Sequence, residues 1–336
     1  MTPMVLVWAK FAVCAALIGF AGPVLTRYGD IIARRTGVSR TWIGLILLAT
    51  ATSLPELFTG VSAVTVAAAP NIAVGDALGS CVFNLAMLVV LDAMHRGEPM
   101  YNRMDQGHIL TAGFGVILIG FAGASLLLGR NGLNLSFFHV GVYTPIIFVL
   151  YLVAMRAAFV YERRRPTSQA TVDNDPEVTL AMAVTRYLAA AAVVVGAGAW
   201  LPFVGVEIAD VMGWRTTFVG TLFVAGATSL PELVVTISAL RLGALDMAIA
   251  NLLGSNLFDV LILAIDDLFY VRGPLLSAVS PTHAITAFAA VIMSGILIVA
   301  LLYRPATRFH GTIGWVSLAL LVVYVLSSYA IYLHGH

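Results

Sequence analysis

Charge is scarce in this sequence. Asp, Glu, Lys and Arg make up 10% of its 336 residues, whereas a soluble globular domain carries about 25%. Lysine occurs once, as Lys10, and cysteine twice, as Cys14 and Cys81. Both cysteines lie in apolar runs, so we expect no disulfide framework. No basic patch indicates nucleic-acid binding, and a net charge of +1 carries no information about partners.

Apolar residues predominate in the sequence. They make up 60% of the chain, and the mean hydropathy is +0.96. Runs of about 20 apolar residues recur along almost the whole length, and each can cross a bilayer core. We therefore predict an all-α polytopic membrane protein of ten transmembrane helices. The predicted spans are 4–25, 42–67, 71–94, 107–128, 136–160, 179–200, 216–240, 246–269, 283–303 and 311–333.

The connections between the spans predict their orientation. Connections 26–41, 95–106, 156–186, 241 and 304–308 carry 14 Arg, and the opposite side carries Arg130, Arg215 and Arg272. Because cytoplasmic loops are rich in Arg and Lys, both termini are predicted outside. The first apolar run lacks a cleavage pattern and leads into further spans, so we expect it to be its own insertion signal. Residues 26–40 are polar enough to extend the first helix along the interface.

The same seven letters, ATSLPEL, occur at Ala51–Leu57 and at Ala227–Leu233. Five predicted crossings separate the two copies, so they enter the membrane from opposite sides. This predicts two inverted five-helix repeats, an architecture typical of transporters. The first repeat is expected at residues 1–161 and the second at 179–336. A cytoplasmic linker at 162–178 joins them.

Each ATSLPEL segment places a proline and a glutamate in the middle of a predicted span. Pro55 and Pro231 remove a backbone donor and crowd an earlier carbonyl, which frees polar groups at membrane depth. Glu56 and Glu232 follow directly, and a carboxylate inside a membrane normally needs a basic partner. No Lys or Arg lies between residues 40 and 96, 215 and 241, or 241 and 272. The partner is therefore expected to be distant in sequence, a proton or a bound cation.

The spans that follow carry polar residues along one helical face. One set is Asp76, Ser80 and Asn84, and the other is Asn251, Ser255 and Asp259. Both sets have the spacing i, i+4, i+8. Together with the glutamates and the freed carbonyls, they form a set of hard oxygen donors without a His or Cys cluster. Such a set suits Ca²⁺ and Na⁺ rather than zinc or copper.

The two segments, ATSLPEL with GDALGSCVFN and ATSLPEL with ANLLGSNLFD, resemble the α-repeats of the cation/Ca²⁺ exchanger superfamily. The chain looks most like the Na⁺/Ca²⁺ exchanger branch, and the resemblance covers nearly its whole length. It implies ten helices around a central cluster of ion sites, with the first and sixth helices sliding against the core. It also implies that Glu56 and Glu232 bind Ca²⁺ directly and help to bind Na⁺. The other implied ligands are the carbonyls of Thr52 and Thr228, the Na⁺ ligands Ser53, Ser229, Ser80 and Ser255, and the polar residues Asn84 and Asp259.

Three positions depart from the family pattern. Asp76 stands where the family usually has Asn, Ala250 replaces a Gly, and Cys81 replaces the Asn of GSN. Asp76 adds a carboxylate near the outer mouth of the predicted site, and we count it among the metal ligands. This extra charge bears on which cations the site prefers. We interpret Cys81 as a packing residue.

Several functions compete on this scaffold. The first is an antiporter that exchanges Na⁺ for Ca²⁺ by alternating access, with no organic cofactor and no protein partner. The alternative is an H⁺/Ca²⁺ antiporter, because burial raises the affinity of a carboxylate for a proton; proton-coupled relatives, however, usually show a GN-x-x-E motif. An intramembrane aspartyl protease would need a GxGD motif around Asp76, which reads AVGD, and HExxH is absent. We therefore expect a transporter and no enzyme, in a prokaryotic plasma (inner) membrane, while a passive Ca²⁺ channel stays conceivable.

Overall fold

The computed structural model describes residues 3–35, 49–95, 100–130, 135–163, 178–241, 243–305, 308–309 and 313–334. Within these ranges, eight helices are long and apolar enough to cross a membrane. They are α1 (Pro3–Arg35), α5 (Pro70–Met94), α7 (His108–Arg130), α8 (Tyr143–Arg163), α9 (Leu180–Met212), α13 (Leu245–Phe269), α14 (His283–Tyr303) and α15 (Trp315–His334). The chain is therefore a helical, multi-pass membrane protein, as predicted.

A ninth apolar span is bent by 44° between Thr216–Thr228 and Leu230–Arg241. It consists of α10 (Thr216–Val219), the π-helical turn η2 (Gly220–Val224), α11 (Ala225–Thr228) and α12 (Leu230–Arg241). The predicted span 42–67 is described only from Ala49, as α3 (Ala49–Thr52) and α4 (Leu54–Thr65). Ten helices therefore stay a prediction, because part of this span lies outside the described residues. Most of the predicted linker, at 164–177, lies outside them too.

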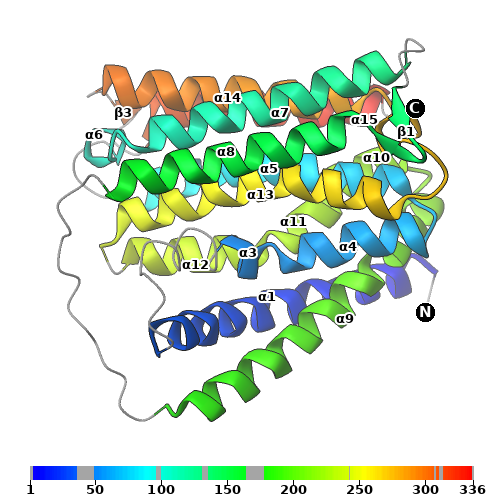
Figure 1. The fold of residues 1–336 in the computed structure, drawn as a ribbon, viewed down its shortest axis with the longest axis horizontal. Helices are drawn as coiled ribbons and strands as arrows, with labels where there is room; N and C mark the ends of the chain where they lie inside the picture. Colours follow the sequence, from blue (N-terminus) through cyan, green and yellow to red (C-terminus); the bar gives the residue numbers. More distant parts are fainter. Residues whose placement is uncertain are drawn as a thin grey trace.

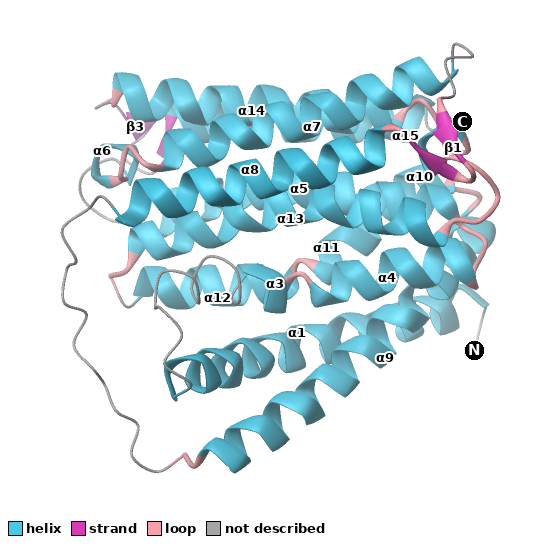
Figure 2. Cartoon of the chain, in the orientation of Figure 1, coloured by secondary structure: helices cyan, strands magenta, loops and turns pink. Residues whose placement is uncertain are grey.

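Two predicted spans begin too early. Residues 136–141 form a hairpin of β1 (Ser136–Phe137) and β2 (Val140–Gly141), and α8 starts only at Tyr143. In the same way β3 (Arg308–Phe309) pairs with β4 (Ile313–Gly314) just before α15. Figure 2 shows the first hairpin at one end of the helix bundle. The sequence count missed both hairpins because their apolar letters extend the hydropathy of the helix that follows.

Other boundaries also differ from the predicted ones. Helix α1 continues to Arg35, so the polar stretch after residue 25 does extend the first helix as far as the description goes. Helix α9 runs on to Met212, well past the predicted end at 200, and stops at Gly213, whose φ of 66° is left-handed. A glycine adopts this conformation without steric cost and so ends the helix there. The short α6 (Met100–Arg103) and the 3₁₀ turn η3 (Leu275–Ser277) complete the helical elements.

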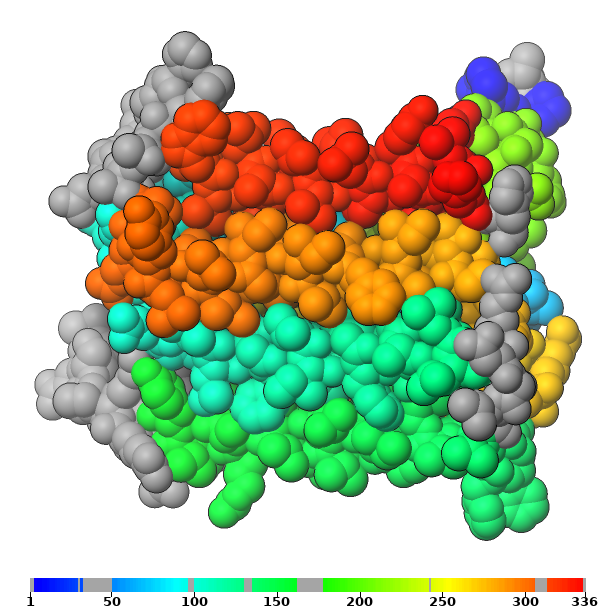
Figure 3. Space-filling view, turned by 90° about the horizontal axis from the view of Figure 1, so that it is seen from above, coloured from blue at the N-terminus to red at the C-terminus, as the bar shows by residue number. Residues whose placement is uncertain are grey.

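The helices are arranged in layers. Figure 3 shows one face of the molecule, where α15, α14, α7 and α8 lie side by side in that order. Helices α1 and α9 pack together at the opposite side (Figure 1). Helices α5 and α13 lie between these layers, and 78% and 89% of their central windows are buried, against 22% for α1 and α15. The polar faces predicted on the third and eighth spans are thus at the centre of the protein.

Asp267, near the end of α13, holds the first hairpin in place. Its buried carboxylate accepts hydrogen bonds from Gly141 N (2.8 Å), Tyr143 Oη (2.5 Å), Thr144 Oγ1 (2.5 Å) and Leu275 N (2.7 Å). Four donors around one carboxylate satisfy a charge that would otherwise be costly to bury. The end of α13 is therefore fixed to the start of α8, which lies more than a hundred residues earlier in the chain.

Asp92 does the same for the second hairpin. It stands at the end of α5, at the position that matches Asp267 when the two ATSLPEL halves are aligned. Its Oδ2 accepts from Gly314 N at 2.6 Å and from Ser317 Oγ at 2.7 Å. A helix of each half of the chain is thus bonded to a hairpin of the other half.

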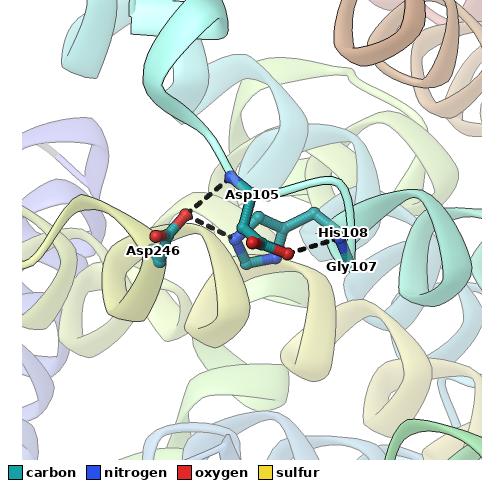
Figure 4. Close-up of polar contacts among 4 residues, drawn as sticks. All are labelled: Asp105, Gly107, His108 and Asp246. Atoms are coloured by element: carbon teal, nitrogen blue, oxygen red, sulfur yellow. Dashed lines mark hydrogen bonds and ion pairs between the residues drawn. The ribbon is translucent and has the colours of Figure 1, made fainter. Parts of the chain in front are cut away.

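A further polar contact joins the opposite end of α13 to α7, as Figure 4 shows. Asp246 Oδ1 lies 3.1 Å from His108 Nε2 and accepts a hydrogen bond from Asp105 N at 2.9 Å. Asp105 Oδ1 in turn accepts from Gly107 N. Both ends of α13 are therefore fixed by carboxylates, which leaves its middle to carry the candidate site.

Candidate functional site: a buried cluster of oxygen donors

Each ATSLPEL segment forms a helix that breaks at its serine. Helix α3 ends at Thr52, and α4 begins after Ser53, whose φ and ψ are −90° and 13°. Ser229 breaks the second copy between α11 and α12 with nearly the same φ and ψ, −80° and 9°. The proline then falls in the first turn, where its missing N–H has no helical partner to lose.

The breaks place both glutamates at helix N-termini. Glu56 lies in the first turn of α4, and Glu232 lies in the first turn of α12. The free N–H groups and the dipole of a helix N-terminus stabilise negative charge. A carboxylate that is costly at membrane depth is thus partly compensated by the backbone itself.

The two breaks exchange hydrogen bonds reciprocally. Ser53 Oγ donates to Glu232 Oε1 at 3.1 Å, and Ser229 Oγ donates to Glu56 Oε1 at 3.2 Å. Each serine thus reaches the glutamate of the other half of the chain. In Figure 1, α4 lies to the right of α3, whereas α12 lies to the left of α11, so the two broken helices run in opposite directions.

The central helices α5 and α13 supply the remaining polar groups. Ser80 Oγ lies 3.0 Å from Ser229 Oγ, and Ser255 Oγ lies 3.5 Å from both Thr52 Oγ1 and Glu232 Oε1. Ser80 therefore connects α5 to the break before α12, and Ser255 connects α13 to α3 and α12. These contacts place the predicted hydroxyls beside both glutamates.

The polar face of α5 contacts α11 at one end and α13 at the other. Thr228 Oγ1 donates to Asp76 Oδ1 at 2.8 Å. Asn84 Nδ2 lies 3.4 Å from Asp259 Oδ2 and 3.0 Å from Asn256 Oδ1. The eleven predicted ligands thus form several hydrogen-bonded groups that join the two halves of the chain, and each ligand is at most 1% exposed.

Six oxygen atoms of the residues predicted at the two breaks and along the two helical faces are buried without a hydrogen-bond donor among the described residues. They are Glu56 Oε2, Asp76 Oδ2, Asn84 Oδ1, Glu232 Oε2, Asn251 Oδ1 and Asp259 Oδ1. Buried polar atoms are rarely left unsatisfied, because each costs about 1–3 kcal/mol or more. All six are hard acceptors, which is the ligand type that Ca²⁺ and Na⁺ select.

Electrostatics points the same way. Glu232, Asp259 and Asp76 lie close enough to Glu56 for their charges to repel it. None of these four carboxylates is paired with a Lys or Arg that the structure describes. In the described chain no three His, Cys, Asp or Glu side chains gather as a single metal cluster. Hydroxyl and amide groups contact the four acids, and this mixture suits alkali and alkaline-earth ions better than zinc.

One participant was missed by the sequence reasoning. Asn256, 2% exposed, joins α13 to α5 by accepting from Asn84 and by donating from Nδ2 to Cys81 O at 3.3 Å. Cys81 Sγ lies 3.7 Å from Asn256 O and 3.9 Å from Asp259 Oδ2. Alignment of the two GS motifs, GSC and GSN, would have paired Cys81 with Asn256 and singled out both.

Helices α1 and α9 close the cluster from one side. A Cβ added at Gly22 of α1 would lie 2.3 Å from Pro231 Cγ, and one at Gly198 of α9 would lie 3.0 Å from Pro55 O. Each of the two long helices therefore contacts the break of one ATSLPEL segment through a glycine. Lys10 of α1 and Glu207 of α9 form an ion pair of 2.6 Å that joins the two helices to each other.

Buried oxygen donors at two helix breaks inside a multi-pass bundle define a membrane transporter for hard cations. Comparison with known proteins agrees, because the family described as sodium/calcium exchanger protein matches residues 6–157 and 182–333. The chain belongs to this family, and the resemblance read from the two ATSLPEL segments is confirmed. Family and fold are those of an exchanger and not of an enzyme.

Individual relatives come from prokaryotes. The chain is 28% identical over 318 residues to the membrane protein MJ0091 of Methanocaldococcus jannaschii, covering 91% of this chain and 95% of that one. It is 28% identical over 272 residues to the sodium/calcium exchanger MaX1 of Methanosarcina acetivorans, covering 71% and 76% of the two chains. The inner membrane protein YrbG of Escherichia coli is 24% identical, with 77% and 78% covered.

The fold also matches solved structures. The sodium-calcium exchanger NCX_Mj, soaked with Na⁺ and Ca²⁺, superposes with a TM-score of 0.60 at 23% identity. The match covers 96% of this chain and 98% of that one. At this identity the likeness establishes the arrangement of the helices. It says nothing about which ions this chain binds.

Proposed function

We propose that the protein is a secondary antiporter that exchanges Na⁺ for Ca²⁺ at the oxygen cluster. The observation that carries the proposal is the set of six buried acceptor oxygens without donors. They come from both halves of the chain, and the two broken helices exchange Ser–Glu hydrogen bonds between these halves. The proposed ligands are the residues predicted from the sequence, with Glu56 and Glu232 at the centre.

Charge balance supports exchange rather than leak. Glu56, Asp76, Glu232 and Asp259 are four acids in one buried region, and one Ca²⁺ carries only two positive charges. When Ca²⁺ leaves, the uncompensated carboxylates would be expensive at membrane depth. Several Na⁺ ions, bound to the same carboxylates and to the serine hydroxyls, would take its place. The two cations thus compete for one set of oxygens.

The two halves of the chain provide the alternating access. We infer an inverted repeat of residues 1–161 and 179–336, joined by a cytoplasmic linker at 162–178, with both termini outside. Three observations support it: the opposite directions of the broken helices, the matching carboxylates at Asp92 and Asp267, and the two stretches of the family match. We place the protein in the plasma membrane of a prokaryote, as its relatives suggest.

The competing function is H⁺/Ca²⁺ exchange at the same site. It is favoured by the same four carboxylates, since protons can neutralise buried acids that lack basic partners. It is disfavoured by the serine hydroxyls of the site. Those of Ser53, Ser229 and Ser255 contact a glutamate, and that of Ser80 contacts Ser229. Such hydroxyls can be ligands of a metal ion, but binding of a proton to a carboxylate does not need them. We therefore assign the coupling ion as Na⁺.

The test is Ca²⁺ uptake into proteoliposomes that contain the purified protein. The vesicles are loaded with Na⁺, K⁺ or choline, each with and without a pH gradient. We expect uptake only from Na⁺-loaded vesicles. Uptake driven by a pH gradient in choline would refute Na⁺ coupling, and Ca²⁺ conductance without any counter-ion would show a channel.

A further inference from the structure

One of the buried acids outside the oxygen cluster has no hydrogen-bond donor for its side chain among the described residues. Asp266 of α13 is 0% exposed, and both of its carboxylate oxygens are without a hydrogen-bond donor among the described residues. Its neighbour in sequence, Asp267, is fully hydrogen-bonded to the first hairpin. A structural role of the kind that explains Asp267 therefore does not explain Asp266.

The carboxylate of Asp266 faces the backbone of α4. A Cβ built at Gly60, one turn beyond Glu56, would lie 2.3 Å from Asp266 Oδ2 and 2.7 Å from Oδ1. Glycine is thus the residue that lets this acid fit between α4 and α13. In the part of the chain that is described, no three acidic, His or Cys side chains gather as a metal cluster.

The matching place in the other half of the chain is built differently. Aligning Glu56 with Glu232 and Asn84 with Asp259 pairs Gly60 with Thr236 and Asp266 with Leu91. Leu91 is buried in the apolar core, and Thr236 accepts a hydrogen bond from Asn251. The fold therefore accommodates an apolar side chain at this position. An acid occurs at this position in the second half of the chain but not in the first. Asp266 is therefore not needed for the fold, which indicates a functional role.

Other charged groups near Asp266 are acidic. The charges of Asp76 on α5 and of Asp267 on its own helix both act on it. Helix α4 presents Gly60 there, and Tyr143 of α8 is bonded to Asp267. His108 of α7 lies at the opposite end of α13, beside Asp246. Both charges have the same sign as an Asp266 carboxylate, and no Lys or Arg among the described residues forms an ion pair with it.

We propose that Asp266 is a proton-binding site, loaded from the side of the membrane at which α13 ends and emptied when a cation occupies the neighbouring cluster. Asp266 lies one turn from the end of α13 at Phe269, on the side that the proposed orientation places outside. A cation bound near Asp76 cancels negative charge beside Asp266, so the carboxyl releases its proton toward the side of the membrane at which α13 ends. The side chain then becomes a carboxylate that attracts the next cation. The inference rests on the proposed function, because it takes the cluster to be the cation site.

The experiment measures proton release on cation binding, with no transport step. Ca²⁺ is added to the purified full-length protein in weakly buffered detergent solution near neutral pH, with a pH indicator, and Ca²⁺ binding is followed in parallel by calorimetry. The wild type is expected to release protons, and the Asp266→Asn variant about one proton fewer per protein. The control is Asp210→Asn, which removes an exposed acid of α9 and is expected to release as many protons as the wild type.

A second variant guards against a folding defect. Asp266→Leu introduces the residue found at the matching position, and it should fold because no hydrogen bond of the side chain is lost. It is expected to lose the same proton as Asp266→Asn. Equal proton release from wild type and either variant, at equal Ca²⁺ binding, would overturn the proposal, as would Ca²⁺ binding by the wild type without proton release. Absence of Ca²⁺ binding in all variants would instead reject the cation site itself.

Discussion

Replacing Asp267 by Asn tests how the two halves of the chain are held together. The carboxylate receives two bonds at each oxygen, from Tyr143 and Leu275 at Oδ1 and from Gly141 and Thr144 at Oδ2. Asparagine keeps one acceptor oxygen, so its amide N–H groups face two donors. Hydrogen bonds to a charged group contribute about 1.5–3 kcal/mol each. The loss of two lowers the free energy of unfolding by about 3–6 kcal/mol.

Thermal unfolding in detergent with a thiol-reactive fluorescent dye measures this loss. Cys14 and Cys81 are both free and 0% exposed, so the dye reacts only as the helices separate. We expect a midpoint several degrees below that of the wild type, and no more than a small change for Asp210→Asn, because surface substitutions usually alter stability by less than about 0.5 kcal/mol. An unchanged midpoint for Asp267→Asn would refute the idea that this carboxylate ties α13 to the first hairpin.

Two further predictions concern the site and its packing. Glu56→Gln and Glu232→Gln should each weaken Ca²⁺ binding by at least about a thousandfold, since even a pair of unit charges at about 4 Å is worth about 4 kcal/mol at an effective dielectric constant of about 20, and Ca²⁺ carries two charges. Calorimetry on folded protein checks this, and normal uptake by both variants would contradict the assignment. Gly79→Ala should lower the unfolding midpoint, because its Cβ would lie 2.4 Å from the carbonyl oxygen of Thr221. Gly113→Ala is the matched control, with no atom within 4 Å of the added carbon, and equal midpoints for the two would show that α5 does not need this close approach.

The helical architecture followed from local pattern alone. Apolar runs predicted the approximate positions of the spans that the structure describes, because hydropathy over about 20 residues depends on the local sequence alone. Errors occurred at the ends, where α9 continues to Met212 and where hairpins precede α8 and α15. At the two hairpins the outcome depends on bonds to the distant carboxylates of Asp267 and Asp92. The hydropathy of a local segment does not reveal hydrogen bonds to residues far away in the sequence.

The residues of the candidate site were also accessible from the sequence. The duplication of ATSLPEL identified Glu56 and Glu232, and helical spacing identified the faces of α5 and α13 that carry the other donors. Asn256 was missed, although the pairing of GSC with GSN indicated it. Its importance arises from contacts with Cys81 and Asn84 on a helix more than 170 residues earlier.

What the sequence determined by itself is therefore the class of protein, the duplicated motif and the residues that share a helical face. What only the tertiary structure decided is which faces meet. Ser53 bonds to Glu232 and Ser229 to Glu56, and Asp266 is buried without a donor against Gly60. Periodicity along one helix determines the direction in which a side chain points. Its partner depends on the packing of helices that are far apart in the chain.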